Sequence, residues 1–337
     1  MTVPGPGISV VIPNWNGRRW LPECLGCLAA QTRCADEVIV VDNGSDDGSL
    51  EYLRDQHPRV RALAQRRNTG FAFAANRGIE AASGELVALI NTDVVLSPDW
   101  LARMAAALRV RPAAASVACK MLSLSEPGVL YDAGDILRRD GACEQRGRFM
   151  PDGGAYDVPG DVFGACAGAA LYRRDAVLGV GGFDERYFAY LEDVDLALRL
   201  RLAGWTCAYE PAVCWHAGEG SSAQLRGGHL PLVTRNTVLL VAKAFPVRWL
   251  GLVAYRQLGW AYHALLERRL GAHVRALAAA MPLLGHALAE RRRLSSEAVV
   301  PISAAIPSRP IRGGRRRSAS GGGNERREMG ECGAELT

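Results

Sequence analysis

Two clusters of polar residues in this 337-residue chain have the composition and spacing of a reactive site. The first lies in LVALINTDVVLSP, where an apolar run ends on Asn91 and Asp93. If the strand persists, these alternate positions place both side chains on the same side. Mg²⁺ and Mn²⁺ prefer carboxylate and carbonyl oxygens, and phosphate oxygens commonly complete their shell. The motif indicates a divalent metal site, and a turn or a helix N-cap is the alternative.

The second cluster lies in YLEDVDLALRL, where Glu192, Asp193 and Asp195 interrupt an otherwise apolar stretch. Carboxylates gathered at the start of a buried helix repel one another and lose hydration, so they indicate a cation or a role in proton transfer. Acidic residues favoured by the helix dipole are the structural alternative. His216 follows in WHAGEGSS and, together with both clusters, is a candidate second metal ligand, while the serines and N–H groups of that loop suit phosphate.

The elements that must position these residues are short apolar runs alternating with amphipathic helical patterns. The strand pattern recurs at residues 8–13, 37–43, 60–65, 85–93 and 114–122. This alternation predicts an α/β fold with a mostly parallel sheet. Polar side chains follow the strands, with Asn16 after the first, Asp42 after the second and Asn68 after the third. Because ligands bind outside the carboxyl ends of such strands, we expect one sheet edge to carry the whole site.

The remainder of the chain divides by composition. Residues 121–165 are Gly-rich and have an irregular pattern, and a helical pattern then ends at Gly204. We expect one domain over residues 1–245, basic amphipathic helices over residues 246–294, and a disordered tail rich in Arg, Gly and Ser over residues 295–337.

Charge and cysteine content limit the location of the protein. The net charge is +5, and residues 245–293 contain eight basic and two acidic side chains. The sequence has no signal-peptide pattern and no run of about 18 apolar residues, which favours a cytoplasmic protein, with peripheral contact at the inner face of the cell membrane as a further expectation. Nine cysteines, an odd number without a signal peptide, indicate reduced thiols.

The first strand-to-helix turn excludes one class of enzyme. Its sequence is PNWNG, which lacks the G-x-G-x-x-G cradle for a dinucleotide and disfavours a nicotinamide dehydrogenase. Asp42, at the end of the second strand, has the position of a residue that accepts hydrogen bonds from a nucleotide base or ribose. The alternative is a turn residue in DNGSDDGS.

Six blocks in this order resemble the family 2 glycosyltransferases of the GT-A fold, and most closely their bacterial rhamnosyltransferase-like members. The blocks are VVIPNWNG, VIVVDNGSDDGS, RRNTGFAFAANRGI, LINTDVVLSPDWL, GGFDERYFAYLEDVDLALRLRLAGW and WHAGEGSS, within about residues 8–245. The resemblance implies an inverting transfer from a nucleoside diphosphate sugar of the dTDP or UDP type. The implied acceptor is a hydroxyl of a saccharide or of a polyprenyl-diphosphate-linked saccharide in cell-envelope polysaccharide synthesis.

The resemblance also implies roles for individual residues. Asp93 is similar to the metal-binding aspartate of a D-x-D element, whose first position here is Asn91, and His216 is the expected second ligand of Mg²⁺ or Mn²⁺. Asp193 resembles the catalytic base, with Glu192 and Asp195 supporting it. The residues expected to hold the nucleotide are Pro13, Asn16, Asp42, Asn68, Asn76, Asn91 and Arg235.

Residues 246–294 are similar to the membrane-associating tail of these relatives, and basic amphipathic segments bind anionic lipid surfaces. An ordinary packing helix is the alternative.

A nucleotidyltransferase would need a triphosphate loop rich in Gly, Lys and Arg, which PNWNGRR hardly provides. A catalytically silent binding protein of the same fold stays open because of Asn91. The tail sequence RGGRRRSASGGG has no aromatic residue for base stacking, so no specific nucleic acid is expected.

Overall fold

The computed structural model describes residues 6–218 and 230–308. Its N-terminal half is a parallel sheet in the order β3-β2-β1-β4. The strands are β1 (Ile8–Asn14), β2 (Glu37–Asp42), β3 (Arg61–Ala64) and β4 (Leu86–Ile90). Their connections are the helices α1 (Leu21–Ala29), α2 (Ser49–Gln56) and α3 (Phe71–Ala81). The strands expected near residues 8, 37, 60 and 85 are confirmed.

The C-terminal half extends the same sheet beyond β4. In it, β11 lies antiparallel between β4 and β6, and β12 is parallel to β6. The strands are β5 (Val94–Leu96), β6 (Ala114–Ser123), β7 (Leu130–Asp132), β10 (Gly160–Val162), β11 (Ala169–Arg173) and β12 (Thr206–His216). The long strands other than β11 run in one direction, so the expected α/β fold with a mostly parallel sheet is confirmed.

The strands are continuous apolar runs because both faces of the sheet are covered. Val10 and Ile12 of β1 pack on the side of α1, α2 and α4 (Trp100–Val110). Val11 points the other way, toward α3, α5 (Arg174–Gly179) and α6 (Glu192–Leu202). Helix α3 lies so close to β1 that a Cβ on Gly78 would be 2.1 Å from Val11 Cγ1. This packing fixes the strand ends that carry the polar residues.

The irregular pattern expected for residues 121–165 is only partly correct. This stretch contains β7 and β10 and also a two-stranded hairpin of β8 (Asp135–Leu137) and β9 (Cys143–Gln145). These strands have three residues each, which is too short to produce a readable alternation in the sequence.

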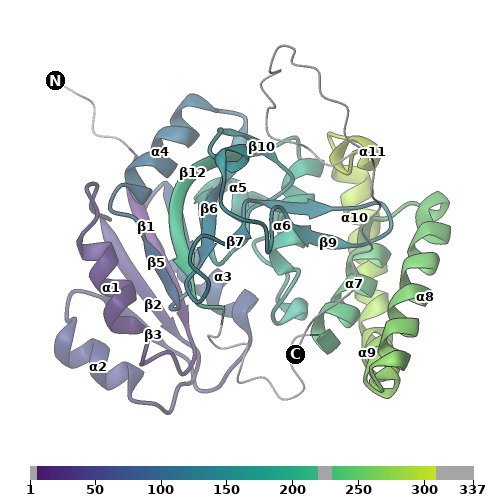
Figure 1. Cartoon of the computed structure of the whole chain (residues 1–337), viewed down its shortest axis with the longest axis horizontal. Helices are drawn as coiled ribbons and strands as arrows, with labels where there is room; N and C mark the ends of the chain where they lie inside the picture. Colours follow the sequence, from purple (N-terminus) through teal and green to yellow (C-terminus); the bar gives the residue numbers. More distant parts are fainter. Residues whose placement is uncertain (1–5, 219–229, 309–337) are drawn as a thin grey trace.

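A layer of helices covers one end of the sheet, on the right in Figure 1. It consists of α7 (Leu230–Ala244), α8 (Leu250–Leu266), α9 (Leu270–Ala280), α10 (Leu284–Glu297) and α11 (Ile302–Ala305). Val253 of α8 and Leu294 of α10 share a hydrophobic cluster with Val194 and Leu198 of α6. The helices after residue 245 are therefore packed onto the domain that carries α6.

The boundary expected at residue 295 requires a correction. Helix α10 continues to Glu297, and Ile306 is completely buried. Arg139 donates hydrogen bonds to the carbonyl oxygens of Ser303 and Ile306, both at 3.0 Å. A few apolar residues suffice to hold this stretch because they pack into the hydrophobic cluster formed with α6 and α7. The rest of the expected tail, residues 309–337, lies outside the described residues.

In the described parts of the chain, every helix is too short or too polar to cross a bilayer.

Candidate active site

The carboxyl ends of β1, β2 and β3 meet at one edge of the sheet, as expected. Asp42 is completely buried at the end of β2. Its Oδ2 accepts a hydrogen bond from Asn14 Nδ2 at 2.7 Å, and its Oδ1 accepts one from Ser45 N at 3.0 Å. Both oxygens thus hold the turn that follows β2, so the turn interpretation describes the contacts of this carboxylate.

The neighbouring loops are held by amides. Asn16 has a φ of +50°, and its Oδ1 accepts a hydrogen bond from Asp46 N at 2.9 Å. Asn68 Oδ1 accepts hydrogen bonds from Asn43 Nδ2 at 3.0 Å and Gly70 N at 2.9 Å. Pro13 is half-buried on the same edge. The structure therefore brings Pro13, Asn16, Asp42 and Asn68 together in adjoining loops, and their contact with a nucleotide stays a prediction.

Asp93 and His216 come together although 123 positions separate them in the sequence. Strand β5 pairs with β12 so that Val94 lies opposite His216, which places the imidazole beside the preceding residue. Asp93 Oδ1 lies 3.2 Å from His216 Nε2, and both side chains are buried. Neither ring nitrogen of His216 makes a hydrogen bond within the described residues. Two buried ligating groups lie side by side at the sheet edge.

This pair fits a hard divalent cation. Mg²⁺ and Mn²⁺ accept one or two protein ligands and take their remaining ligands from water and substrate phosphates. Within the described residues no cluster of three or more His, Cys, Asp and Glu side chains is placed to hold a metal. Asn91 is half-buried nearby, at the end of β4, and its backbone N donates to Gly168 O at 2.8 Å. Asp93 and His216, with the adjacent Asn91, are therefore the residues that would hold such an ion, and their metal binding stays a prediction.

Asp193 occupies the first turn of α6. Its Oδ1 accepts a hydrogen bond from Val194 N at 2.8 Å, and its Oδ2 accepts one from Ala167 N at 3.1 Å. Burial raises the pKa of this carboxyl, and the two N–H groups oppose that rise. Asp193 is half-buried, whereas Glu192 and Asp195 on either side are buried. It is thus the member of the cluster that an acceptor hydroxyl reaches most readily.

Two further carboxylates, Asp132 and Asp135, accompany Asp193 and Glu192. Burial raises the pKa of Asp132 to about 7, and burial together with the charge of Asp193 raises the pKa of Asp135 and Glu192 well above the ordinary range. Each of the three has a buried oxygen without a hydrogen-bond partner in the described residues. Sequence reasoning missed Asp132 and Asp135 because they lie in the stretch read as irregular. The signal was YDAGD, two acidic residues spaced among apolar and small ones.

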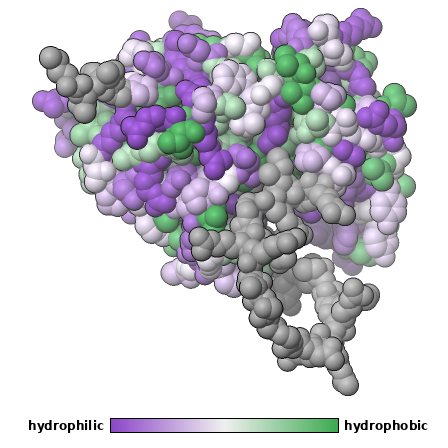
Figure 2. Space-filling model, turned by 90° about the horizontal axis from the view of Figure 1, so that it is seen from above, coloured by the Kyte–Doolittle hydropathy of each residue, from purple (hydrophilic) through white to green (hydrophobic). Residues whose placement is uncertain are grey.

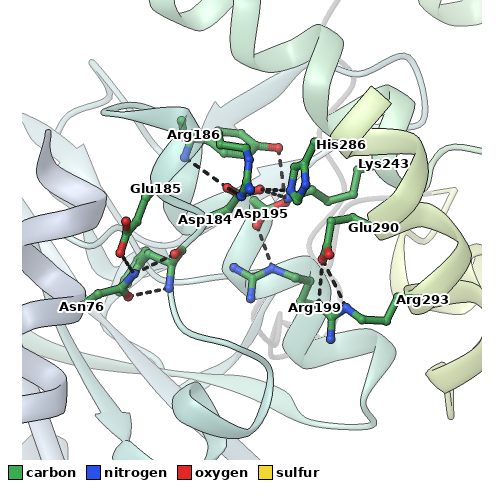
Figure 3. Close-up of polar contacts among 12 residues, drawn as sticks. Asn76, Asp184, Glu185, Arg186, Asp195, Arg199, Lys243, His286, Glu290 and Arg293 are labelled. Atoms are coloured by element: carbon green, nitrogen blue, oxygen red, sulfur yellow. Dashed lines mark hydrogen bonds and ion pairs between the residues drawn. The ribbon is translucent and has the colours of Figure 1, made fainter. Parts of the chain in front are cut away.

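Asp195 points to the opposite side of α6, toward buried cations (Figure 3). Its Oδ1 accepts a hydrogen bond from Lys243 Nζ at 2.7 Å, and its Oδ2 accepts one from Arg199 Nε at 2.7 Å. Burial opposes ionisation, but Lys243 and Arg199 lower the pKa of Asp195 below its ordinary value. The structure separates this residue from Asp193, and its contacts are those of a structural ion pair.

Asn76 and Arg235 both contact the segment before α6. Asn76 Nδ2 donates to Phe183 O at 2.8 Å and to Glu185 Oε1 at 3.0 Å (Figure 3). Arg235 Nη2 donates to the carbonyl oxygens of Arg186 and Tyr187 at 2.8 and 2.7 Å. Both residues thus hold the segment before α6, and their contact with a nucleotide stays a prediction.

A parallel α/β sheet with its polar site at one edge, continued by a β11–β12 half that contributes the histidine, defines the GT-A type of sugar-nucleotide enzyme. The family model for "Glycosyl transferase family 2" matches residues 9–180. The chain therefore belongs to glycosyltransferase family 2 and is a glycosyltransferase of the rhamnosyltransferase-like type.

One relative is similar along most of both chains. It is the N-acetylglucosaminyl-diphospho-decaprenol L-rhamnosyltransferase of Mycobacterium tuberculosis, 31% identical over 276 residues, which are 72% of this chain and 88% of the relative.

Two solved structures share the fold. The mannosyltransferase PcManGT from Pyrobaculum calidifontis, in complex with GDP-Man and Mn²⁺, has a TM-score of 0.53 at 21% identity, covering 90% of this chain and 86% of its own. S. aureus TarS 1-349 in complex with UDP has a TM-score of 0.52 at 18% identity, covering 88% and 91%.

Proposed function

We propose that this glycosyltransferase is inverting and metal-dependent, and that it transfers rhamnose from a dTDP-type donor to a saccharide linked to a polyprenyl diphosphate. The Asp93–His216 pair carries the metal part of the proposal. The relative from Mycobacterium tuberculosis supports the sugar and the acceptor, since its name states both.

Asp93 and His216 would hold Mg²⁺ or Mn²⁺ at the sheet edge. The ion, when bound, neutralises charge that develops on the departing nucleoside diphosphate as the glycosidic bond breaks. The loops of Asn16, Asp42 and Asn68 would receive the nucleoside on the same edge. Asn91 replaces a carboxylate in this arrangement, so the protein supplies less negative charge to the ion. A larger share of the negative charge around the ion then comes from the diphosphate.

Asp193 would act as the base. Inversion needs a single displacement from the face opposite the leaving group, so one carboxylate that takes the proton of the acceptor hydroxyl is sufficient. The burial that raises the pKa of Asp193 also increases its affinity for that proton.

Asp193→Asn tests this assignment with dTDP-rhamnose and an N-acetylglucosaminyl diphosphate lipid as probes. We expect kcat to fall by about 10²- to 10⁴-fold because general base catalysis is lost, while dissociation of dTDP changes little. Undiminished turnover would remove Asp193 from the mechanism.

The nucleotide and the metal are tested together by thermal stabilisation with dTDP, UDP and GDP, each with and without Mn²⁺ or Mg²⁺. A ligand at 100 times its Kd stabilises the folded state by about 2.7 kcal/mol. We expect a metal-dependent shift with dTDP, lost in Asp93→Asn. Equal shifts with and without metal would contradict the metal site, and a shift with GDP alone would contradict the donor.

A lipid-linked acceptor suggests peripheral contact with the membrane, and α8 supplies a suitable surface. Its outward side chains are 52% to 81% exposed: Leu252, Tyr255, Leu258, Tyr262 and Leu266. On the right-hand edge of Figure 2, the side on which α8 lies in Figure 1, separate hydrophobic residues lie among hydrophilic ones. Together with the basic excess of residues 245–293, this face fits an anionic lipid surface.

Vesicles with and without anionic lipid test this contact. The pair Leu258→Glu and Tyr262→Glu should abolish co-sedimentation with anionic vesicles, and Val110→Glu, at an exposed apolar position of α4, is the control. If the double variant still binds vesicles, α8 is an ordinary surface. If the wild type forms a dimer that the double variant dissociates, α8 is a protein interface.

A further inference from the structure

The segment that leads into α6 has an unusual backbone. We call residues 186–191 the entry segment, because Glu192 and Asp193 follow it directly. Phe188, Tyr190 and Leu191 have φ values of +64°, +68° and +64°. Side chains with a Cβ rarely adopt such values, and residues that do are held by their surroundings. The entry segment contains no glycine, so its shape must be imposed by contacts with other parts of the chain.

Asn236 of α7 supplies the central contact. Its side chain is completely buried, and its Nδ2 lies within hydrogen-bond distance of three carbonyl oxygens of the entry segment. These are Tyr187 O at 3.0 Å, Ala189 O at 2.9 Å and Tyr190 O at 2.7 Å. One amide thus gathers three carbonyl groups around a single point. An extended chain or a helix cannot present its carbonyls in that way, so the amide selects the unusual conformation.

Arg235 extends this contact on the N-terminal side. Its Nη2 reaches the carbonyl oxygens of Arg186 and Tyr187, and its Nε donates to Asn236 Oδ1 at 2.9 Å. The guanidinium therefore orients the amide as well as the segment. Both side chains come from one turn of α7, which belongs to the helical layer.

Lys243, two turns further along α7, ties the two ends of the region together (Figure 3). Its Nζ donates to Asp184 Oδ2 at 2.6 Å, before the entry segment, and to Asp195 Oδ1 at 2.7 Å, after it. The ammonium is buried. With both ends fixed, the remaining freedom of the entry segment lies in its middle, where Asn236 binds.

We propose that Asn236, assisted by Arg235, is a positioning residue for the transfer reaction. By holding the entry segment in its left-handed conformation, it sets where α6 begins and hence where the Asp193 carboxylate points. The inference deepens the proposed function, since it rests on Asp193 as the base. It also gives Arg235 a role different from the nucleotide binding expected from the sequence. Loss of a positioning role lowers kcat, whereas loss of nucleotide binding raises the donor KM.

Asn236→Ala is the first test, with dTDP-rhamnose and the N-acetylglucosaminyl diphosphate lipid as probes. We expect kcat to fall by about 100-fold, the usual effect of displacing a catalytic group by about 1 Å, with the donor KM changed less than twofold. Leu108→Ala in α4 is the control for general destabilisation. Leu108 is buried, and it belongs to a helix far from α7 in the sequence. This variant should keep the wild-type kcat.

A second substitution separates positioning from loss of stability. Leu191→Gly makes the positive φ easy to adopt, so adding it to Asn236→Ala should restore kcat at least tenfold. Arg235→Gln is a milder change than Asn236→Ala and should still fold. It should lower kcat and leave the donor KM unchanged. A raised donor KM in Arg235→Gln would instead support the nucleotide binding that the sequence predicts for Arg235.

Hydrogen exchange gives a readout that does not depend on activity. We expect amides of residues 189–194 to exchange faster in Asn236→Ala and to recover in the double variant. Any of four results would overturn the inference. Two concern Asn236→Ala itself: unchanged hydrogen exchange or a wild-type kcat. The other two are an equal loss of kcat in Leu108→Ala and no recovery of kcat when Leu191→Gly is added. If Asp193→Asn keeps full turnover while Asn236→Ala loses exchange protection and kcat, the base assignment fails and the positioning role stands.

Discussion

Helix α6 separates two groups of buried carboxylates that differ in their partners. On one side, Asp195 and the nearby Asp184 are bound by Lys243, and their pKa values are lowered. On the other, Glu192 and Asp193 face Asp132 and Asp135, and all four pKa values are raised. The first group is compensated by cations and has the contacts of a structural network. In the second, Arg146 and Arg148 act on Asp132 alone and do not offset its burial, so this group is suited to accept a proton, as expected of a reactive site rather than a structural network.

The same comparison explains why α6 needs the helical layer. Lys243 lies on α7, and His286 of α10 comes within 3.7 Å of Asp184 (Figure 3). Part of the compensation of the structural carboxylates thus comes from residues beyond the first 230, and Arg199 of α6 supplies another part. Among the described residues, no salt bridge relieves the repulsion between Asp132, Asp135, Glu192 and Asp193. The ion pairs of Lys243 on α7 hold α6 in place despite this repulsion.

The largest expected effect separates Asp195 from Asp193 by stability. Asp195→Asn leaves the buried charge of Arg199 without its carboxylate and leaves Lys243 with Asp184 alone, so it should lower the free energy of unfolding by about 3 to 5 kcal/mol. Asp193→Asn should change it by less than about 1 kcal/mol, because the amide oxygen keeps one of the two N–H contacts and removal of the charge relieves the repulsion with Asp135 and Glu192, which offsets the loss of the other contact. Urea unfolding at pH 7 measures both. Equal losses would remove the distinction between the two groups.

A smaller effect of opposite sign is expected for Asp132. Its folded pKa of about 7 lies above the ordinary 3.8, so the stability it contributes is present below pH 3.8 and lost as the pH rises to about 7. Asp132→Asn should therefore be more stable than the wild type by about 2 kcal/mol at pH 8, with no such gain at pH 4. Thermal unfolding at both pH values measures this. A destabilised variant at pH 8 would mean that Asp132 is ionised and bound.

The smallest expected effect concerns the acid limb. Lys243 lowers the pKa of Asp184 to about 2 from the ordinary 3.8, against the effect of burial, so its stabilisation is present above pH 3.8 and lost as the pH falls toward 2. We expect the wild type to lose about 1 to 2 kcal/mol more than Asp184→Asn between pH 4 and pH 2. Parallel stability curves for the two proteins would show that Asp184 is not held as an ion.

The sequence by itself determined the α/β sheet, because strands buried on both faces must be apolar throughout and because helices with one apolar face must alternate with them. It also determined which strand ends carry polar groups, and so the edge of the sheet where Asn16, Asp42 and Asn68 lie. The family followed from six ordered blocks, which are local in the chain and readable without distances.

Only the tertiary structure decided which carboxylates belong together. Asp193 and Asp195 are two positions apart in one helix, and a helix turns by about 200° over two residues, so they face different surroundings. Asp132 and Asp135 join Asp193 through short strands with no periodic signal, and Lys243 reaches Asp195 from another helix. Asp93 meets His216 through the pairing of β5 with β12. Such contacts depend on how distant segments pack, which spacing along one chain does not encode.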